Sequence, residues 1–159
     1  GGVGGLASAV CAYFWQVWHA ARPRLIVVEP ESANCLLQSA RNGSPVVVSG
    51  DLNTLMAGLA CGEVSLLAWE ILSIGCADFM TIDEDSVVPC MKLLAQGRFG
   101  DEQIVAGESA VAGLAALIES CHDKSLKSKL QLNSESRVLV IGTEGATDPV
   151  LYDKLLLQM

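Results

Sequence analysis

Apolar stretches along the chain alternate between two lengths, each closed by a turn that contains glycine, proline or acidic residues. Short β-branched runs with such closures are typical of buried strands in a parallel sheet. They predict strands at 24–28, 45–48, 78–82 and 137–141. Longer segments predict helices at 6–21, 32–38, two pieces within 53–75, 83–96, 110–120, 124–131 and 149–158. This order predicts an α/β fold, an open, mostly parallel twisted sheet with helices on both faces.

The predicted helix 6–21 has apolar side chains on nearly every face, because only Ser8, Gln16 and His19 interrupt it. A helix without a polar face is expected to be buried on all sides, as between a sheet and a second layer. The segment is shorter than the roughly 20 apolar residues of a membrane span, so no membrane partner is expected.

A glycine loop precedes this helix, with glycine at positions 1, 2, 4 and 5. Glycine lets successive backbone N–H groups turn toward one point, and the N-terminus of the following helix adds free donors and a positive dipole end. A phosphate group is the natural ligand of such a loop. Two readings fit: Gly2, Gly4 and Ala7 match the dinucleotide pattern G-x-G-x-x-G/A, and the phosphate cup of pyridoxal-phosphate enzymes has nearly the same sequence.

Length, composition and net charge indicate the size of the domain and the classes of partner it can bind. With 159 residues, 51% of them hydrophobic and 18% charged, the chain is long enough for one domain and apolar enough to hide a large face against something else. It begins inside the glycine loop with no strand ahead, so we expect the C-terminal part of a longer protein. The net charge of −8 argues against nucleic acid and anionic membranes as partners.

Cysteine spacing excludes the common metal motifs. The six cysteines show no C-x-x-C pair and no Cys/His ligand spacing, so we expect no metal and reduced thiols in a cytoplasmic protein. The acidic run at 83–85 is interpreted as helix capping and solvated charge.

Four ordered strings carry a family resemblance. The chain reads TLMAGLACGE at 54–63, WEIL at 69–72, GES at 107–109 and GTEGATD at 142–148. With the glycine loop ahead of them, these strings resemble the diaminopropionate ammonia-lyases over essentially all 159 residues. That family belongs to the fold-type II pyridoxal-phosphate enzymes, with the threonine dehydratases, serine racemase and the tryptophan synthase β subunit.

The resemblance implies a fold and a reaction. Residues 1–159 would be the C-terminal part of a lyase catalytic domain whose upstream half is absent, with the large-domain portion of the tryptophan synthase β-like fold. The whole enzyme would use pyridoxal 5'-phosphate to eliminate ammonia from 2,3-diaminopropionate, a small amino-acid substrate, giving pyruvate and ammonia. A homodimer and other oligomeric states stay open, since many members of the group are dimers.

The resemblance also implies site residues. No catalytic residue is expected in this chain, because the Schiff-base lysine lies upstream in this group, and we therefore expect the chain alone to be inactive. At the position where the group commonly has serine facing the pyridine nitrogen, this chain has Gly142, so that hydroxyl either comes from Thr143 or is missing. The cofactor-binding residues implied are Gly2, Val3, Gly4, Gly5 and Leu6 at the phosphate, Gly58 beside the ring, Glu108 at the ring's edge, and Thr143.

Three alternatives stay open. A nucleotide-binding Rossmann-type half-domain would use Glu29 for the ribose hydroxyls, although Glu29 lies 27 positions after Gly2 and the usual spacing is about 20. A threonine or serine dehydratase-like lyase would share the cofactor and differ in substrate. A non-enzymatic interaction domain would explain the apolar surface and none of the ordered motifs.

Overall fold

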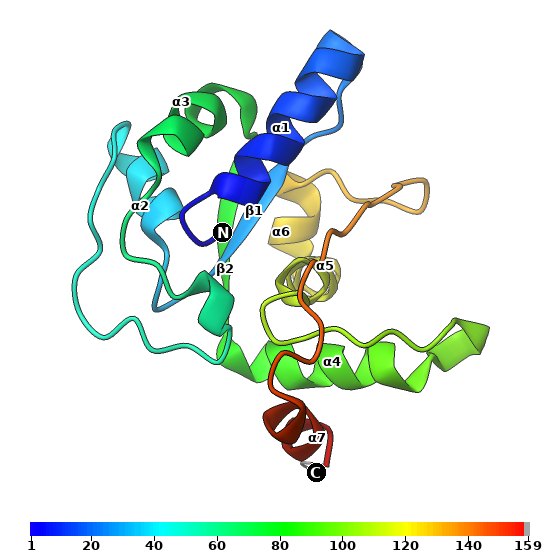
Figure 1. Cartoon of the computed structure of the whole chain (residues 1–159). Helices are drawn as coiled ribbons and strands as arrows, with labels where there is room; N and C mark the ends of the chain where they lie inside the picture. Colours follow the sequence, from blue (N-terminus) through cyan, green and yellow to red (C-terminus); the bar gives the residue numbers. More distant parts are fainter. Residues whose placement is uncertain (158–159) are drawn as a thin grey trace. The chain divides into compact units, whose positions relative to one another are not determined.

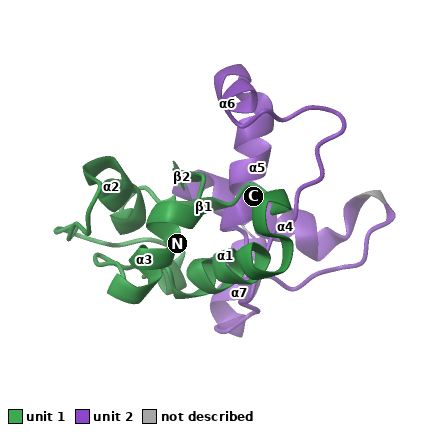
Figure 2. Cartoon of the chain, turned by 90° about the horizontal axis from the view of Figure 1, so that it is seen from above, with its two compact units in different colours: residues 1–83 green, residues 84–159 purple. Residues whose placement is uncertain are grey.

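The computed structural model describes residues 1–157, with Phe99 described by its backbone alone. The chain forms two compact units, Gly1–Asp83 and Glu84–Met159 (Figure 2).

The first unit is built on two parallel strands, β1 (Ile26–Pro30) and β2 (Asp78–Ile82). In their register Val27 pairs with Phe79 and Glu29 with Thr81. Arg24 and Asp78 join the start of the pair through two hydrogen bonds of 2.6 and 2.9 Å. The other elements of this unit are α1 (Gly5–Trp18), η1 (His19–Ala21), α2 (Cys35–Asn42), η2 (Ala57–Leu59) and α3 (Leu66–Gly75).

The core of the first unit lies where β1 meets the helices. Val27 of β1, Leu36 of α2 and Leu72 of α3 are buried in one cluster. Helix α1 packs against α3 (Figure 1). The approach is close at Gly75, where a Cβ atom would meet the sulfur of Cys11 and the ring of Trp15. Glycine at the end of α3 therefore permits this helix pair.

The regular elements described in the second unit are all helices. Its helix α4 (Val87–Gln96) packs against α5 (Ala112–His122) and α7 (Pro149–Leu157), and α5 packs against α6 (Lys124–Lys129) (Figure 1). Two short turns, η3 (Glu84–Ser86) and η4 (Arg98–Gly100), flank α4. The Asp123 side chain caps α6 by accepting from the backbone N–H groups of Ser125 and Leu126. Residue 158, the predicted end of the last helix, lies outside the described residues.

The predicted α/β class with a parallel sheet is confirmed, and β2 has the predicted bounds. The predictions of strands at 45–48 and 137–141 were wrong: both segments lack regular secondary structure and join no ladder among residues 1–157. Instead, the N–H of Val46 donates to the Ser39 hydroxyl and that of Val48 to the Gly62 carbonyl. A β-branched run becomes a strand only where a neighbouring edge is available, and the described chain offers none to these two.

The prediction for the first helix was wrong in its burial. Along α1 only Ser8 and Cys11 are buried, whereas Tyr13 and Trp18 are more than half exposed. The α-helix ends at Trp18 because His19 adopts a positive φ of 48° and starts a 3-10 turn.

Several other elements differ from prediction in their bounds. Strand β1 covers Ile26–Pro30 rather than 24–28, α4 begins at Val87 rather than at 83, and α6 ends at Lys129 rather than at 131. Helix α2 covers Cys35–Asn42 rather than 32–38. The first of the two pieces predicted within 53–75 is only the short turn η2. Helix α5 begins two residues later and ends two residues later than predicted.

Candidate functional site

The glycine loop enters α1 through two left-handed residues, Gly2 with φ of 62° and Gly4 with φ of 92°. A side chain at Gly4 would be strained by this backbone and would also crowd the core. Its Cβ would lie 3.0 Å from Leu72 Cδ1, 3.1 Å from Ala68 Cβ and 3.2 Å from Leu36 Cδ2. The loop is therefore shaped by glycine and is seated directly on the core of the first unit.

The first turn of α1 offers backbone donors. Gly4 caps this helix without a side-chain bond, and its carbonyl accepts from the N–H of Ser8 at 2.8 Å. Among residues 1–157, no acceptor engages the N–H groups of Gly5, Leu6 and Ala7. Leu6 is half exposed, so this end of the helix is open to solvent. Free N–H groups and a positive dipole end at one accessible place are what an anion such as a phosphate needs.

Other parts of the first unit fix the loop. The carbonyl of Val3 accepts from the N–H of Ser65 at 2.9 Å, and the Gly1 nitrogen donates to the Val28 carbonyl at 2.8 Å. These two bonds tie the loop to the start of α3 and to β1.

The structure brings Gly58 to the same loop. A Cβ at Gly2 would lie 3.4 Å from the Gly58 carbonyl oxygen and 3.7 Å from Cys61 Sγ. Gly58 lies in η2 and is exposed. Of the implied cofactor residues, Gly2, Val3, Gly4, Gly5, Leu6 and Gly58 are thus grouped in the first unit.

Glu29 does not have the environment that a nucleotide site requires. Its side chain is fully buried, and its two carboxylate oxygens accept from the N–H groups of Leu36 at 3.0 Å and Leu37 at 2.8 Å. Burial raises the pKa of the Glu29 carboxyl, while these two hydrogen bonds act to lower it. A carboxylate engaged at the N-terminus of α2 is not available to ribose hydroxyls, which removes the acidic residue of the Rossmann reading.

In the second unit, the segment that contains Glu108 lies beside the segment that contains Thr143. The N–H of Gly107 donates to the Glu144 carbonyl at 3.0 Å, and the N–H of Ser109 donates to the Glu144 carboxylate at 2.6 Å. Glu108 is buried and Thr143 is exposed.

Close packing against Ala110 favours glycine at position 142. A Cβ at Gly142 would lie 2.8 Å from the Ala110 carbonyl oxygen. Serine at this position would therefore require the Ala110 backbone to shift. The close approach of these two segments explains why this chain has glycine where the resembled group commonly has serine.

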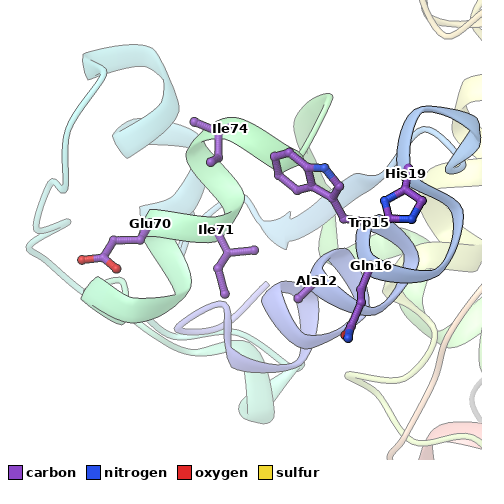
Figure 3. A pocket seen from close by; sticks show the side chains of 7 residues that line it. All are labelled: Ala12, Trp15, Gln16, His19, Glu70, Ile71 and Ile74. Atoms are coloured by element: carbon purple, nitrogen blue, oxygen red, sulfur yellow. The ribbon is translucent and has the colours of Figure 1, made fainter.

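A groove in the first unit lies between α1 and α3, with a volume of about 600 Å³ (Figure 3). It is formed by the C-terminal half of α1, whereas the glycine loop precedes the other end of that helix. It is therefore a feature separate from the phosphate loop. Its lining residues are Ala12, Trp15, Gln16, His19, Glu70, Ile71 and Ile74.

The described residues contain neither a metal-binding cluster nor a membrane-spanning helix. No group of three or more histidine, cysteine or acidic side chains within residues 1–157 has the arrangement of a metal site. No helix in the described part of the chain is both long and apolar enough to cross a membrane.

Sequence reasoning missed the support beneath the loop. The roles of Glu29, Cys35 and Ser65 depend on contacts with distant residues and have no motif of their own. For Glu29 there was one signal, since an acidic residue that ends a buried strand just before a helix can cap that helix.

Comparison with known proteins supports the resemblance. The chain is 39% identical to the diaminopropionate ammonia-lyase of Salmonella typhimurium and 38% identical to that of Escherichia coli strain K12, in each case over 98% of the chain and 40% of the relative. The chain thus spans about 40% of the length of these curated relatives.

Solved structures agree with this. The crystal structure of the Escherichia coli diaminopropionate ammonia lyase in complex with an aminoacrylate-PLP azomethine reaction intermediate matches with a TM-score of 0.88 at 36% identity, covering 98% of this chain and 40% of that one. Maize serine racemase, at 22% identity and a TM-score of 0.70, covers 97% of this chain and 44% of its own and shares the fold. The fold-type II prediction is confirmed.

A family profile gives the assignment. The profile described as "Pyridoxal-phosphate dependent enzyme" matches residues 1–144, which include the glycine loop and the ordered motifs up to Glu144. The open donors of the loop fit the phosphate of that cofactor. The chain belongs to the pyridoxal-phosphate dependent enzyme family, and its cofactor is pyridoxal phosphate.

Proposed function

We propose that this chain is the phosphate-holding part of a carbon–nitrogen lyase that acts on 2,3-diaminopropionate and releases pyruvate and ammonia. The observation that carries the proposal is the glycine loop, whose left-handed residues turn it into the uncapped N-terminus of α1. The choice of substrate is supported by 38–39% identity to diaminopropionate ammonia-lyases over nearly the whole chain.

In this proposal the backbone of residues 2–6 binds the phosphate and so orients the cofactor. Gly58, whose carbonyl oxygen lies close to Gly2, borders the pyridine ring with its backbone. The family resemblance assigns Glu108 to the edge of the ring and the Thr143 hydroxyl to the pyridine nitrogen. When bound, the cofactor supplies an electron sink for the carbanion that forms at the substrate's α-carbon.

The groups that move substrate protons are proposed to lie outside this chain. The lysine that binds the cofactor and the acidic residues that take protons would come from the upstream part of the enzyme, and residues 1–159 alone are expected to be inactive. We also propose a cytoplasmic enzyme, because the six cysteines are free. A homodimer is the proposed assembly, on the ground that many members of the group are dimers.

The test is turnover by the full-length gene product that contains this chain. The purified protein, loaded with pyridoxal phosphate, is assayed for pyruvate with 2,3-diaminopropionate, threonine and serine in parallel. We expect the highest kcat/KM with 2,3-diaminopropionate. A preference for threonine or serine would favour the dehydratase alternative, and turnover by residues 1–159 alone would contradict the placement of the catalytic groups.

A further inference from the structure

A buried acidic residue lies beneath the glycine loop. Glu29, at the end of β1, is 0% exposed, and its carboxylate accepts from the N–H groups of Leu36 and Leu37 in the first turn of α2. Asn34, the residue that caps α2, makes no side-chain cap bond. The N-terminus of α2 is therefore held by a carboxylate from the preceding strand.

Cys35 connects this carboxylate to the loop. It is the first residue of α2 and is 0% exposed, and its sulfur lies 3.6 Å from the Gly2 carbonyl oxygen and 3.9 Å from Glu29 Oε1. Burial, with the nearby Glu29 carboxylate, raises the pKa of the Cys35 thiol to about 11. The thiol is therefore protonated at neutral pH, and its single hydrogen lies within reach of both oxygens, with the shorter distance to the Gly2 carbonyl.

Glu29 also touches the loop directly. A side chain at Gly1 would collide with Glu29 Cγ and would lie 3.0 Å from the Val28 carbonyl oxygen. The loop thus lies on Glu29 with no side chain between them.

The Cys35 contact sets the direction of a loop donor. In a trans peptide the carbonyl oxygen and the next N–H point to opposite sides. Because the Gly2 carbonyl points inward to Cys35, the N–H of Val3 points away from the core. Val3 is 46% exposed, and its N–H has no acceptor within residues 1–157.

We propose that Glu29 is a positioning residue for the phosphate site: it fixes the start of α2, which holds Cys35 beneath Gly2 and so keeps the Val3 N–H turned toward the bound phosphate. This inference rests on the proposed function, because it requires that the loop bind the cofactor's phosphate. Glu29 itself touches neither cofactor nor substrate and acts through the loop.

The charge of Glu29 and its positioning of the loop have opposite effects on phosphate binding, so a substitution can separate the two. A buried negative charge near an anion site weakens anion binding, so its removal alone would strengthen binding. Glu29→Gln removes the charge and keeps the shape, but its amide nitrogen cannot accept from one of the two α2 N–H groups. If Glu29 acts by position, this variant binds phosphate more weakly in spite of the lost charge.

The experiment compares two ligands on the cofactor-free, full-length protein. Dissociation constants for pyridoxal phosphate and for pyridoxal, which lacks the phosphate, are measured by tryptophan fluorescence. For Glu29→Gln we expect a dissociation constant about tenfold higher for pyridoxal phosphate and unchanged for pyridoxal. For Cys35→Ala, which leaves the capping carboxylate in place, we expect about a threefold rise for pyridoxal phosphate alone.

Glu31→Gln is the matched control, because Glu31 lies two residues away and is exposed; we expect it to bind both ligands as the wild type does. Equal weakening for both ligands in Glu29→Gln and Cys35→Ala would indicate a merely structural role and overturn the inference, as would unchanged or tighter binding of pyridoxal phosphate. Wild-type protein that binds pyridoxal phosphate no better than pyridoxal would overturn the proposed function as well.

Discussion

Gly4 is the residue at which the shape of the loop and the packing of the core meet. It holds a φ of 92°, and the space where its Cβ would lie is bordered by Leu72, Ala68 and Leu36. Its neighbour Gly5 begins α1 and has nothing within 4 Å of a Cβ. Adjacent glycines thus have different reasons to be glycine.

This difference predicts that alanine substitutions at Gly4 and Gly5 change the free energy of unfolding in opposite directions. Gly4→Ala is expected to lower the free energy of unfolding of the cofactor-free protein by about 1–3 kcal/mol, from backbone strain and crowding. Gly5→Ala is expected to raise it by about 0.5–1 kcal/mol, because alanine favours the helix. Urea denaturation of both variants measures this, and equal effects would contradict the loop geometry.

Glu29 predicts a pH dependence of stability. Burial raises the pKa of its carboxyl from 4.5, so the folded state binds the proton more tightly than the unfolded state does. The stability that this preference contributes is complete below pH 4.5 and is lost as the pH rises through the higher folded-state pKa. Unfolding free energies of the wild type and Glu29→Gln, measured across pH 4 to 8 in about half-unit steps, should therefore diverge in favour of the variant as the pH rises. A constant difference between the two proteins would refute this.

At the residue scale, sequence predicted what depends on local backbone and missed what depends on distant contacts. The glycine loop was recognisable because positive φ and close approach select glycine at Gly2 and Gly4. The sequence places Cys35 only among six reduced thiols, and nothing in it places the sulfur 3.6 Å from the Gly2 carbonyl. Glu29 was considered for the ribose of a nucleotide, although its carboxylate holds α2.

At the scale of elements, the neighbours of each segment determined whether a predicted strand formed and whether a predicted helix was buried. Residues 78–82 form a strand because β1 lies alongside them. Residues 45–48 and 137–141 are richer in β-branched residues but have no such neighbour in the described chain. Likewise, an apolar sequence over α1 predicted burial on all sides, but Tyr13 is 60% exposed. Periodicity identifies an element, and only tertiary structure determines what covers it.

Helix α3 allows a direct test of its packing. Leu72 is fully buried in the core of the first unit, whereas Leu67 in the same helix is 70% exposed. Leu72→Ala is expected to lower the free energy of unfolding by about 2–5 kcal/mol through lost burial and a cavity. Leu67→Ala is the matched control, with a change within about 0.5 kcal/mol. Thermal and urea unfolding compare the two, and similar losses would contradict the assigned orientation of α3.

At the scale of the whole molecule, sequence motifs predicted family and fold better than they predicted the surface. The ordered strings were sufficient for the fold-type II resemblance, which the match over 98% of the chain supports. The exposed apolar residues, such as Leu139 at 70%, were not assignable to positions from sequence. The implied site residues lie in both compact units, Gly58 in the first and Thr143 in the second.

The visible absorption spectrum of the full-length gene product tests the central claim most directly. The protein is mixed with pyridoxal phosphate, and then with 2,3-diaminopropionate. We predict a visible band that the free cofactor lacks and that 2,3-diaminopropionate changes. A protein that leaves the cofactor spectrum unaltered and binds a nicotinamide nucleotide instead would contradict the account.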